Sequence, residues 1–150
     1  MLEVSQLGKT YGEGDGATHA IASVGFTISE KEFVCVVGPS GCGKTTLLKC
    51  MSGLLGPTTG EVRLGDRRIV DPPPEMALVF QEYSRSLLPW MTVRGNVTLP
   101  LRHKKLDKPE RARLVEEAVG AVGLERFIDR YPWELSGGMQ QRVAIARALA

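Results

Sequence analysis

The segment Gly38–Thr45 combines residue types that could hold the phosphate groups of a nucleotide. It reads Gly-Pro-Ser-Gly-Cys-Gly-Lys-Thr and matches the pattern G-x-x-x-x-G-K-[ST]. Glycines let several backbone N–H groups point at one anion, and a helix that follows adds the positive end of its dipole. The Lys44 ammonium can reach the β- and γ-phosphates, and the Thr45 hydroxyl can bind a Mg²⁺ ion that bridges them. We predict that a nucleotide contacts Gly38, Pro39, Ser40, Gly41, Cys42, Gly43, Lys44, Thr45 and Thr46.

A second motif, Leu135–Arg142, reads Leu-Ser-Gly-Gly-Met-Gln-Gln-Arg and stands at the predicted start of a helix. Ser136 is a favourable N-cap residue. The two glycines after it would leave backbone N–H groups exposed at the positive helix end, which makes a second anion site without a lysine. The alternative is a plain capped helix whose glycines serve a tight turn.

Together and in this order, the two motifs resemble the ATP-binding cassette (ABC) family of transporter ATPases, and the resemblance covers the whole chain. In that family, ATP is held between the phosphate loop of one subunit and the signature sequence of the other. The resemblance therefore implies that the chain pairs with a second copy of itself. It also implies that the γ-phosphate held by the partner copy meets a set of signature residues, namely Leu135, Ser136, Gly137, Gly138, Met139 and Gln140.

The resemblance assigns roles to two further residues. Tyr11 ends the first predicted strand, where the family places an aromatic ring against adenine. Gln81 follows an apolar run, where the family has a glutamine that contacts Mg²⁺ or the attacking water. The resemblance thus implies catalytic roles for Lys44 and Gln81, metal contacts from Thr45 and Gln81, and ATP with Mg²⁺ as cofactors. Without the family, Tyr11 would be a half-buried strand tyrosine and Gln81 a surface residue.

The segment Leu87–Met91 is strongly apolar for a loop. It either packs a helical subdomain or lines a groove that receives a short helix of a membrane permease, with Trp90 as the anchor. The pattern from Phe80 to Val97 is similar to that of importers of nitrate, sulfonate, taurine and bicarbonate, although Tyr83–Ser86 makes the loop longer than in some of them. The resemblance implies transmembrane permease subunits that dock near Gln81–Met91 and, indirectly, a solute-binding protein.

The hydrophobic pattern predicts the elements that would position these motifs. Two segments, 2–7 and 20–28, favour strands of an antiparallel region, and 61–70 favours a short hairpin around Gly65-Asp66. The continuous apolar runs Phe33–Val37 and Met76–Phe80 predict buried strands of a parallel sheet. Helical spacing and start signals predict helices at 45–52, 107–122 and 138–150.

These elements predict an α/β fold. We expect a P-loop NTPase core (RecA-like) with an N-terminal antiparallel β region and an α-helical subdomain, incomplete at the C-terminus. Residues 1–150 would form a partial ATP-binding domain, with the β region and core at about 1–86, the helical subdomain at about 87–136 and the signature helix at 137–150. The family continues with the Walker B aspartate and a catalytic glutamate, which this sequence lacks, so the resemblance implies ATP binding with poor hydrolysis.

Composition limits the other classes of function. The 150 residues are 43% hydrophobic and 24% charged, with a net charge of +2, which favours a folded domain and argues against a nucleic-acid partner. No apolar run approaches the roughly 20 residues of a membrane span, and no secretory signal begins the chain. The three cysteines form no CxxC pair. We therefore expect a cytoplasmic protein that lies peripherally on the inner face of the plasma membrane.

The function predicted from the sequence is ATP-driven import of a small solute, for example nitrate, sulfonate or taurine, by a motor subunit. Three alternatives stay open. The first is a soluble ABC-type ATPase that acts on nucleic acid or ribosomes, and the second is an unrelated P-loop kinase or GTPase, which would not need Leu135–Arg142. The third is a module that binds nucleotide without turnover. The solute is not determined here, because pore and solute-binding residues belong to other chains.

Overall fold

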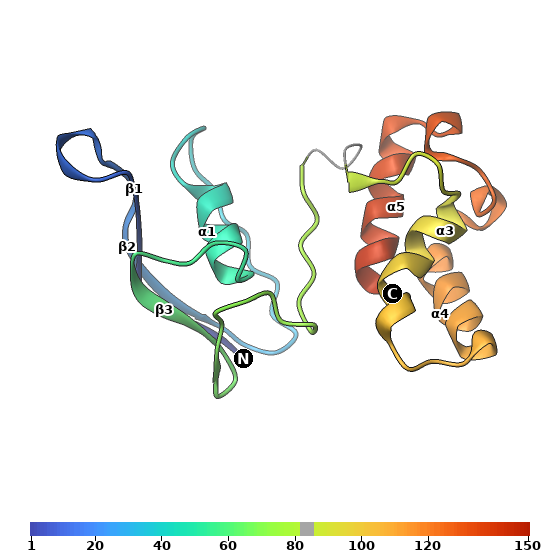
Figure 1. The fold of residues 1–150 in the computed structure, drawn as a ribbon, viewed down its shortest axis with the longest axis horizontal. Coiled ribbons are helices and arrows are strands. Elements are labelled where there is room, and N and C mark those ends of the chain that lie inside the picture. The colour runs from blue at the N-terminus through green and yellow to red at the C-terminus, as the bar shows by residue number, and fades with distance from the viewer. Residues whose placement is uncertain (82–85) are drawn as a thin grey trace. The chain divides into compact units, whose positions relative to one another are not determined.

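The computed structural model describes residues 1–81 and 86–150. The chain forms two compact units, Met1–Met76 and Ala77–Ala150, and each is described by itself. The first contains a small sheet with one helix, and the second contains helices and short 3₁₀ turns (Figure 1). None of the helices in the described ranges has the length and hydropathy of a membrane span.

A four-stranded antiparallel sheet forms the first unit, in the order β2-β1-β3-β4. The strands are β1 (Leu2–Tyr11), β2 (Thr18–Ile28), β3 (Thr59–Leu64) and β4 (Arg67–Arg68). In the central strand β1, Val4 lies opposite Phe26 of β2 on one side and Val62 of β3 on the other. The predicted antiparallel region and the hairpin around Gly65-Asp66 are confirmed.

An irregularity at Gln6 sets which side chains of β1 face the core. Leu2 and Val4 are buried, and strict alternation would next turn Gln6 inward. Gln6 instead adopts a φ of 48°, and the register with β2 shifts between Val4 and Leu7. This is the geometry of a bulge, which places Leu7 on the buried face and keeps the amide side chain exposed.

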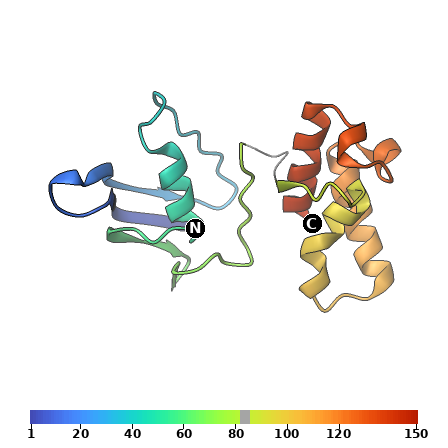
Figure 2. The ribbon, with the colours of Figure 1, turned by 45° about the horizontal axis from the view of Figure 1, so that its top comes forward.

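Helix α1 (Lys44–Met51) follows the phosphate loop and packs against this sheet (Figures 1 and 2). Its buried side chains Leu47, Cys50 and Met51 join Leu2, Val4, Leu7, Val62 and Ile69 in one apolar cluster. Residues three and four apart lie on one helix face, so this spacing turns a single face of α1 to the core. The sheet therefore fixes the direction of the helix whose first residue is Lys44.

The second unit contains three α-helices among its described residues: α3 (Val93–Thr98), α4 (Lys108–Ala121) and α5 (Gly137–Leu149). Three 3₁₀ turns connect them: η2 (Leu99–His103), η3 (Glu125–Phe127) and η4 (Pro132–Glu134). A further 3₁₀ turn, η1 (Gly14–Gly16), lies in the first unit, between β1 and β2. The helices predicted at 45–52, 107–122 and 138–150 are confirmed within one or two residues, and the Asp107 carboxylate caps α4 by accepting from the Glu110 N–H.

The core of the second unit lies between α3, α4 and α5. Its members are the fully or nearly buried side chains Leu87, Val93, Val97, Leu101, Val115, Ala118, Val119, Leu124, Leu135, Val143, Ala144 and Ala146. Leu87 and Leu135 come from segments outside the helices, so this core also anchors the loop before α3 and the approach to α5.

Among the described residues of the second unit, Asn96 is the buried polar side chain, and it organises the loop before α3. Its amide nitrogen donates to the backbone carbonyls of Leu88, Met91 and Thr92, each at 3.1 Å. Its amide oxygen accepts from the Leu88 N–H at 2.8 Å. A buried amide is tolerated only when its groups are paired. The side chain thus replaces regular secondary structure for Leu88–Thr92.

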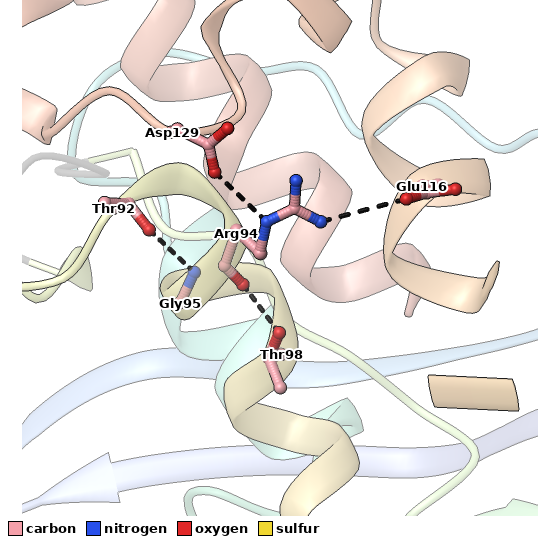
Figure 3. Close-up of polar contacts among 6 residues, drawn as sticks. All are labelled: Thr92, Arg94, Gly95, Thr98, Glu116 and Asp129. Carbon is pink, nitrogen blue, oxygen red and sulfur yellow. Dashed lines mark hydrogen bonds and ion pairs between the residues drawn. The ribbon is translucent and has the colours of Figure 1, made fainter. Parts of the chain in front are cut away.

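Arg94 joins the start of α3 to two other segments (Figure 3). Its guanidinium lies 3.1 Å from the Asp129 carboxylate and 3.9 Å from that of Glu116 on α4. These pairs are exposed, so each contributes little to stability. Two backbone hydrogen bonds also orient the start of α3, because the Val93 and Arg94 N–H groups donate to the carbonyls of Arg130 and Ile128.

Two strand predictions are wrong. Phe33–Val37 and Met76–Phe80 have no strand geometry. Phe33 is 94% exposed and Val37 83% exposed, whereas a buried strand was expected. Strand backbone groups need a neighbouring strand to pair with, and within residues 1–81 and 86–150 no strand pairs with either segment. Apolar composition indicates which segment suits a buried strand but does not supply the neighbours.

We predict that Asn96→Ala lowers the free energy of unfolding of this chain by about 2 kcal/mol, because it leaves buried carbonyl groups unpaired. Urea unfolding followed by circular dichroism measures the change. Asn96→Asp is the informative comparison, since it keeps the acceptor for the Leu88 N–H and loses the donors to the three carbonyls. Equal stability of the wild type and both variants would contradict the assigned role.

Candidate functional site

The turn Gly38–Gly43 brings the chain from an irregular segment into helix α1. Gly41 and Gly43 have φ values of 82° and 94°, in the left-handed region that favours glycine. A Cβ atom at Gly43 would lie 2.5 Å from the Ala20 carbonyl oxygen of β2, so the turn is pressed against the sheet and admits no side chain there. The sheet thus positions the loop as well as the helix.

The backbone N–H groups of this turn are available to a ligand. Among the described residues, those of Gly41, Gly43, Lys44, Thr45 and Thr46 donate no hydrogen bond. No side chain caps the start of α1. Unpaired N–H groups at a helix start carry partial positive charge and attract anions. The sequence prediction of an inward-facing set of donors fits this arrangement.

Lys44 lies across the same loop. Its ammonium donates to the carbonyl oxygens of Gly38 and Pro39, both at 2.7 Å, and lies 3.7 Å from the Cys42 sulfur. A cation bound this way faces the turn rather than solvent, and its three donors can be exchanged between carbonyl and phosphate oxygens.

Tyr11 and Thr46 meet beside the phosphate loop, although 35 residues separate them. The Tyr11 hydroxyl lies 3.5 Å from the Thr46 hydroxyl. The ring is 42% exposed, and the Lys9 ammonium lies 5.5 Å from its centre. An exposed aromatic ring at this place could stack on a flat, uncharged group. The structure therefore brings Tyr11 together with the phosphate loop, as the resemblance implied.

The chemistry of Thr45 fits a magnesium ion held mainly by phosphate oxygens. Thr45 is exposed, and its hydroxyl makes no hydrogen bond with the described chain. No group of three or more His, Cys, Asp or Glu side chains within residues 1–81 and 86–150 could form a metal cage. Mg²⁺ commonly takes one or two protein oxygens and completes its octahedron with phosphates and water, so a single hydroxyl is consistent with it.

The three cysteines occupy different environments. Cys42, in the phosphate loop, and Cys35 are exposed, whereas Cys50 is buried in the core of the first unit. Burial raises the pKa of the Cys50 thiol, and the nearby Lys9 charge opposes this only in part. Cys50 is therefore a packing residue, and Cys42 is the thiol that lies at the candidate site.

The second motif forms the start of α5. Ser136 is its N-cap, and the hydroxyl accepts from the Met139 N–H at 3.3 Å. Ser136, Gly137 and Gly138 are exposed, and the N–H groups of the two glycines donate no hydrogen bond in the described chain. Leu135 is buried in the core. The motif thus anchors one side in the protein and presents free donors on the other.

Gln140 behaves differently from its neighbours in the motif. It is half-buried, and its amide nitrogen donates to the carbonyls of Pro132 at 2.9 Å and Leu135 at 3.3 Å. Both carbonyls belong to the segment that leads into α5. The side chain therefore binds the protein itself, whereas the sequence placed Gln140 among the residues that meet the partner's nucleotide.

The predicted docking segment near Gln81–Met91 divides by burial. Leu87 is 3% exposed and packs the core, while Trp90 is 68% exposed. Gln81 is exposed, and it belongs to the other unit from the phosphate loop. The sequence predicts a longer loop at Tyr83–Ser86. Residues 82–85 lie outside the described residues, so of this segment the structure describes Ser86. Arg147 of α5 donates to the Ser86 carbonyl and hydroxyl oxygens.

Sequence reasoning missed two features of the second unit. One is the network of Asn96, whose signal was a lone amide within an apolar helical pattern. The other is a pair of stacked rings, Tyr131 and Trp133, with centroids 4.5 Å apart and planes 8° from parallel. Trp133 is 65% exposed, and the pair borders an open cavity of about 540 Å³. In the sequence, the two aromatic residues on either side of Pro132 were the signal that could have indicated this stacked pair.

The known proteins that are similar to this chain indicate one protein family. The family description "ABC transporter" matches residues 21–150. An uncharacterized ABC transporter ATP-binding protein of Methanocaldococcus jannaschii is 46% identical over 99% of this chain and 55% of its own length. A nitrate import and a bicarbonate transport ATP-binding protein of Synechocystis are 43% and 40% identical, each over 99% of this chain and over 22% and 53% of their own lengths.

A solved structure extends the comparison to the fold. It is a dimeric ATP-binding cassette in a post-hydrolysis state, bound to ADP and phosphate. It is 37% identical to this chain with a TM-score of 0.86, and the match covers 100% of this chain and 69% of that one. The chain thus has the fold of the ABC cassette, while it spans about half the length of the first relative named above. By the family match and by this fold, the chain belongs to the ABC transporter family, as an ATP-binding domain.

Proposed function

We propose that the chain belongs to the ATP-binding and hydrolysing motor subunit of an ABC importer. One observation carries this proposal: the N–H groups of Gly41 and Gly43–Thr46, the Lys44 ammonium and the Tyr11 ring surround the start of a single helix. This set matches the parts of a nucleoside triphosphate, which has a flat base at one end and three charged phosphates at the other.

The residues of the phosphate loop would divide the work by chemistry. The free N–H groups and Lys44 bind phosphate oxygens, and Tyr11 stacks on the base. Thr45 would hold Mg²⁺, which neutralises charge on the β- and γ-phosphates. Gln81 would contact that ion or orient the attacking water. Lys44 and Gln81 are then the catalytic groups within these 150 residues.

The exposed start of α5 supports a paired arrangement. Ser136, Gly137 and Gly138 offer donors to an anion but include no cation to balance a triphosphate. The phosphate loop of a second copy would bring the negatively charged phosphates together with the lysine that the start of α5 lacks. Pairing would then be driven by ATP, because only the triphosphate is long enough to reach both surfaces. The dimeric cassette bound to ADP and phosphate, similar to this chain, is consistent with such pairing.

The proposed partners beyond the second copy are transmembrane permease subunits and, through them, a solute-binding protein. Trp90, exposed on a loop that Asn96 holds in place, would anchor a permease segment near Gln81–Met91. The names of two relatives, nitrate import and bicarbonate transport, support a small anion as the solute without choosing between them. The subunit would then lie at the cytoplasmic face of the plasma membrane and need no nucleic acid.

We predict that Lys44→Ala weakens ATP binding by this chain about tenfold or more, because it removes charge-assisted bonds to phosphate. Titration with a fluorescent ATP analogue measures the dissociation constant. Lys49→Ala is the matched control, since Lys49 is a half-buried lysine in the last turn of the same helix. The same affinity for Lys44→Ala and Lys49→Ala would rule out the proposed phosphate site.

A second prediction concerns the start of α5. In the full-length subunit, Ser136→Arg should abolish ATP-dependent dimerisation, because a bulky side chain blocks the exposed donors of the helix start. The affinity of the monomer for ATP should be unchanged, since the phosphate loop is intact. Sedimentation velocity with and without Mg²⁺ and a non-hydrolysable ATP analogue measures dimerisation, and titration with a fluorescent ATP analogue measures the affinity of the monomer. Normal dimerisation of this variant would show that α5 does not face the partner's nucleotide.

A further inference from the structure

We propose that Gln140 is a positioning residue that fixes the start of α5 against the preceding turn η4. Its role would be to hold Ser136–Gly138 in the conformation that the partner's nucleotide requires. This inference rests on the proposed function of Ser136–Gly138, and it concerns a residue that touches neither nucleotide nor metal.

The contacts of Gln140 account for both donors of its amide. The amide nitrogen donates to the carbonyl of Pro132 at 2.9 Å and to that of Leu135 at 3.3 Å. A primary amide has two N–H donors, so none is left for a ligand. The backbone N–H of the same residue donates to the Ser136 carbonyl at 2.9 Å. Gln140 therefore binds the N-cap residue itself and two residues that precede it.

The turn to which Gln140 is bonded is fixed by other contacts. The Glu134 carboxylate accepts from the Tyr131 N–H at 2.7 Å and from the Arg130 guanidinium at 2.8 Å. Together these bonds hold the pKa of Glu134 below its usual range. The Tyr131 ring stacks on that of Trp133, while Pro132 and Leu135 are buried. Turn η4 is thus a rigid support for the Gln140 side chain.

The helix start itself has few contacts that could order it. Gly137 has no side chain to pack, and a Cβ atom at Gly138 would find no atom within 4 Å. Glycines lose more conformational freedom on ordering than other residues, which makes a two-glycine helix start costly to fix. The Ser136 cap lies within the helix start, so among the described residues it is the Gln140 amide that hydrogen-bonds this segment to η4 and to Leu135. Order provided before binding lowers the cost of binding.

The test compares Gln140→Met with wild type in the full-length subunit. Methionine has a similar length but no donor, so the contacts to Pro132 and Leu135 are lost. Thr98→Val is the matched control, because it removes a comparable bond from the Thr98 hydroxyl to the Arg94 carbonyl, neither of which belongs to the start of α5 (Figure 3). Three quantities are measured: the melting temperature, monomer affinity for Mg²⁺ with a non-hydrolysable ATP analogue, and the dimer dissociation constant.

We expect Gln140→Met to weaken nucleotide-dependent dimerisation about tenfold, which corresponds to about 1.4 kcal/mol, with monomer affinity unchanged. Hydrogen exchange at the amides of Gly138 and Met139 should be faster in the nucleotide-free monomer, since a positioning role acts before the partner arrives. Thr98→Val should change neither the dimer dissociation constant nor the hydrogen exchange of these amides. Dimerisation and exchange equal to wild type in folded Gln140→Met would overturn the proposal.

A second variant decides the matter if Gln140→Met does not fold. Gln140→Glu places a carboxylate against two carbonyl oxygens at neutral pH, and protonation restores one donor. Its dimerisation, relative to wild type at each pH, should improve as the pH falls, and a constant ratio would overturn the proposal. Normal dimerisation of Ser136→Arg would contradict the proposed function. If the Gln140 variants dimerise normally while Ser136→Arg does not, only the positioning role of Gln140 is contradicted.

Discussion

The first backbone N–H groups of an α-helix have no acceptor within the helix, and in the described part of this chain they stay open at the starts of α1 and α5. At the start of α1, a turn supported by β2 presents its donors beside Lys44. At the start of α5, the glycines after Ser136 present theirs without a cation. The two sites belong to different compact units, so each unit supplies one anion-binding surface. In the proposed arrangement, a triphosphate held between two copies would satisfy both.

The remaining structure can be understood as support for these helix starts. The bulge at Gln6 keeps the apolar face of β1 turned toward α1, and the close approach of Ala20 to Gly43 fixes the turn. In the second unit, the core between α3, α4 and α5 buries Leu135 directly before Ser136. Asn96 fixes a different part of the same unit, the loop that exposes Trp90. The proposed nucleotide and partner surfaces are thus held by separate contacts.

Local signals in the sequence predicted the sites better than the strands around them. The turn into α1, the Ser136 cap and the Asp107 cap depend on neighbours a few residues away, and each is found at the start of its helix, while phosphate binding by the first stays a prediction. Phe33–Val37 was predicted as a buried strand and is exposed, because strand formation depends on distant partners. A place for Tyr11 beside the nucleotide was implied only by the family, and its contact with Thr46 was not predicted. The contacts of Gln140 could not be predicted, since nothing in its spacing indicates carbonyl acceptors at Pro132 and Leu135.

A mixing experiment tests the central claim, that each nucleotide site is made by two copies. Full-length Lys44→Ala and Ser136→Arg subunits should each be inactive alone. In a mixed pair, the intact phosphate loop of one copy faces the intact α5 start of the other, and this restores one complete site. The account therefore predicts ATP hydrolysis on mixing where neither variant shows any. No recovery, with both variants folded and shown to pair in the mixture, would contradict it.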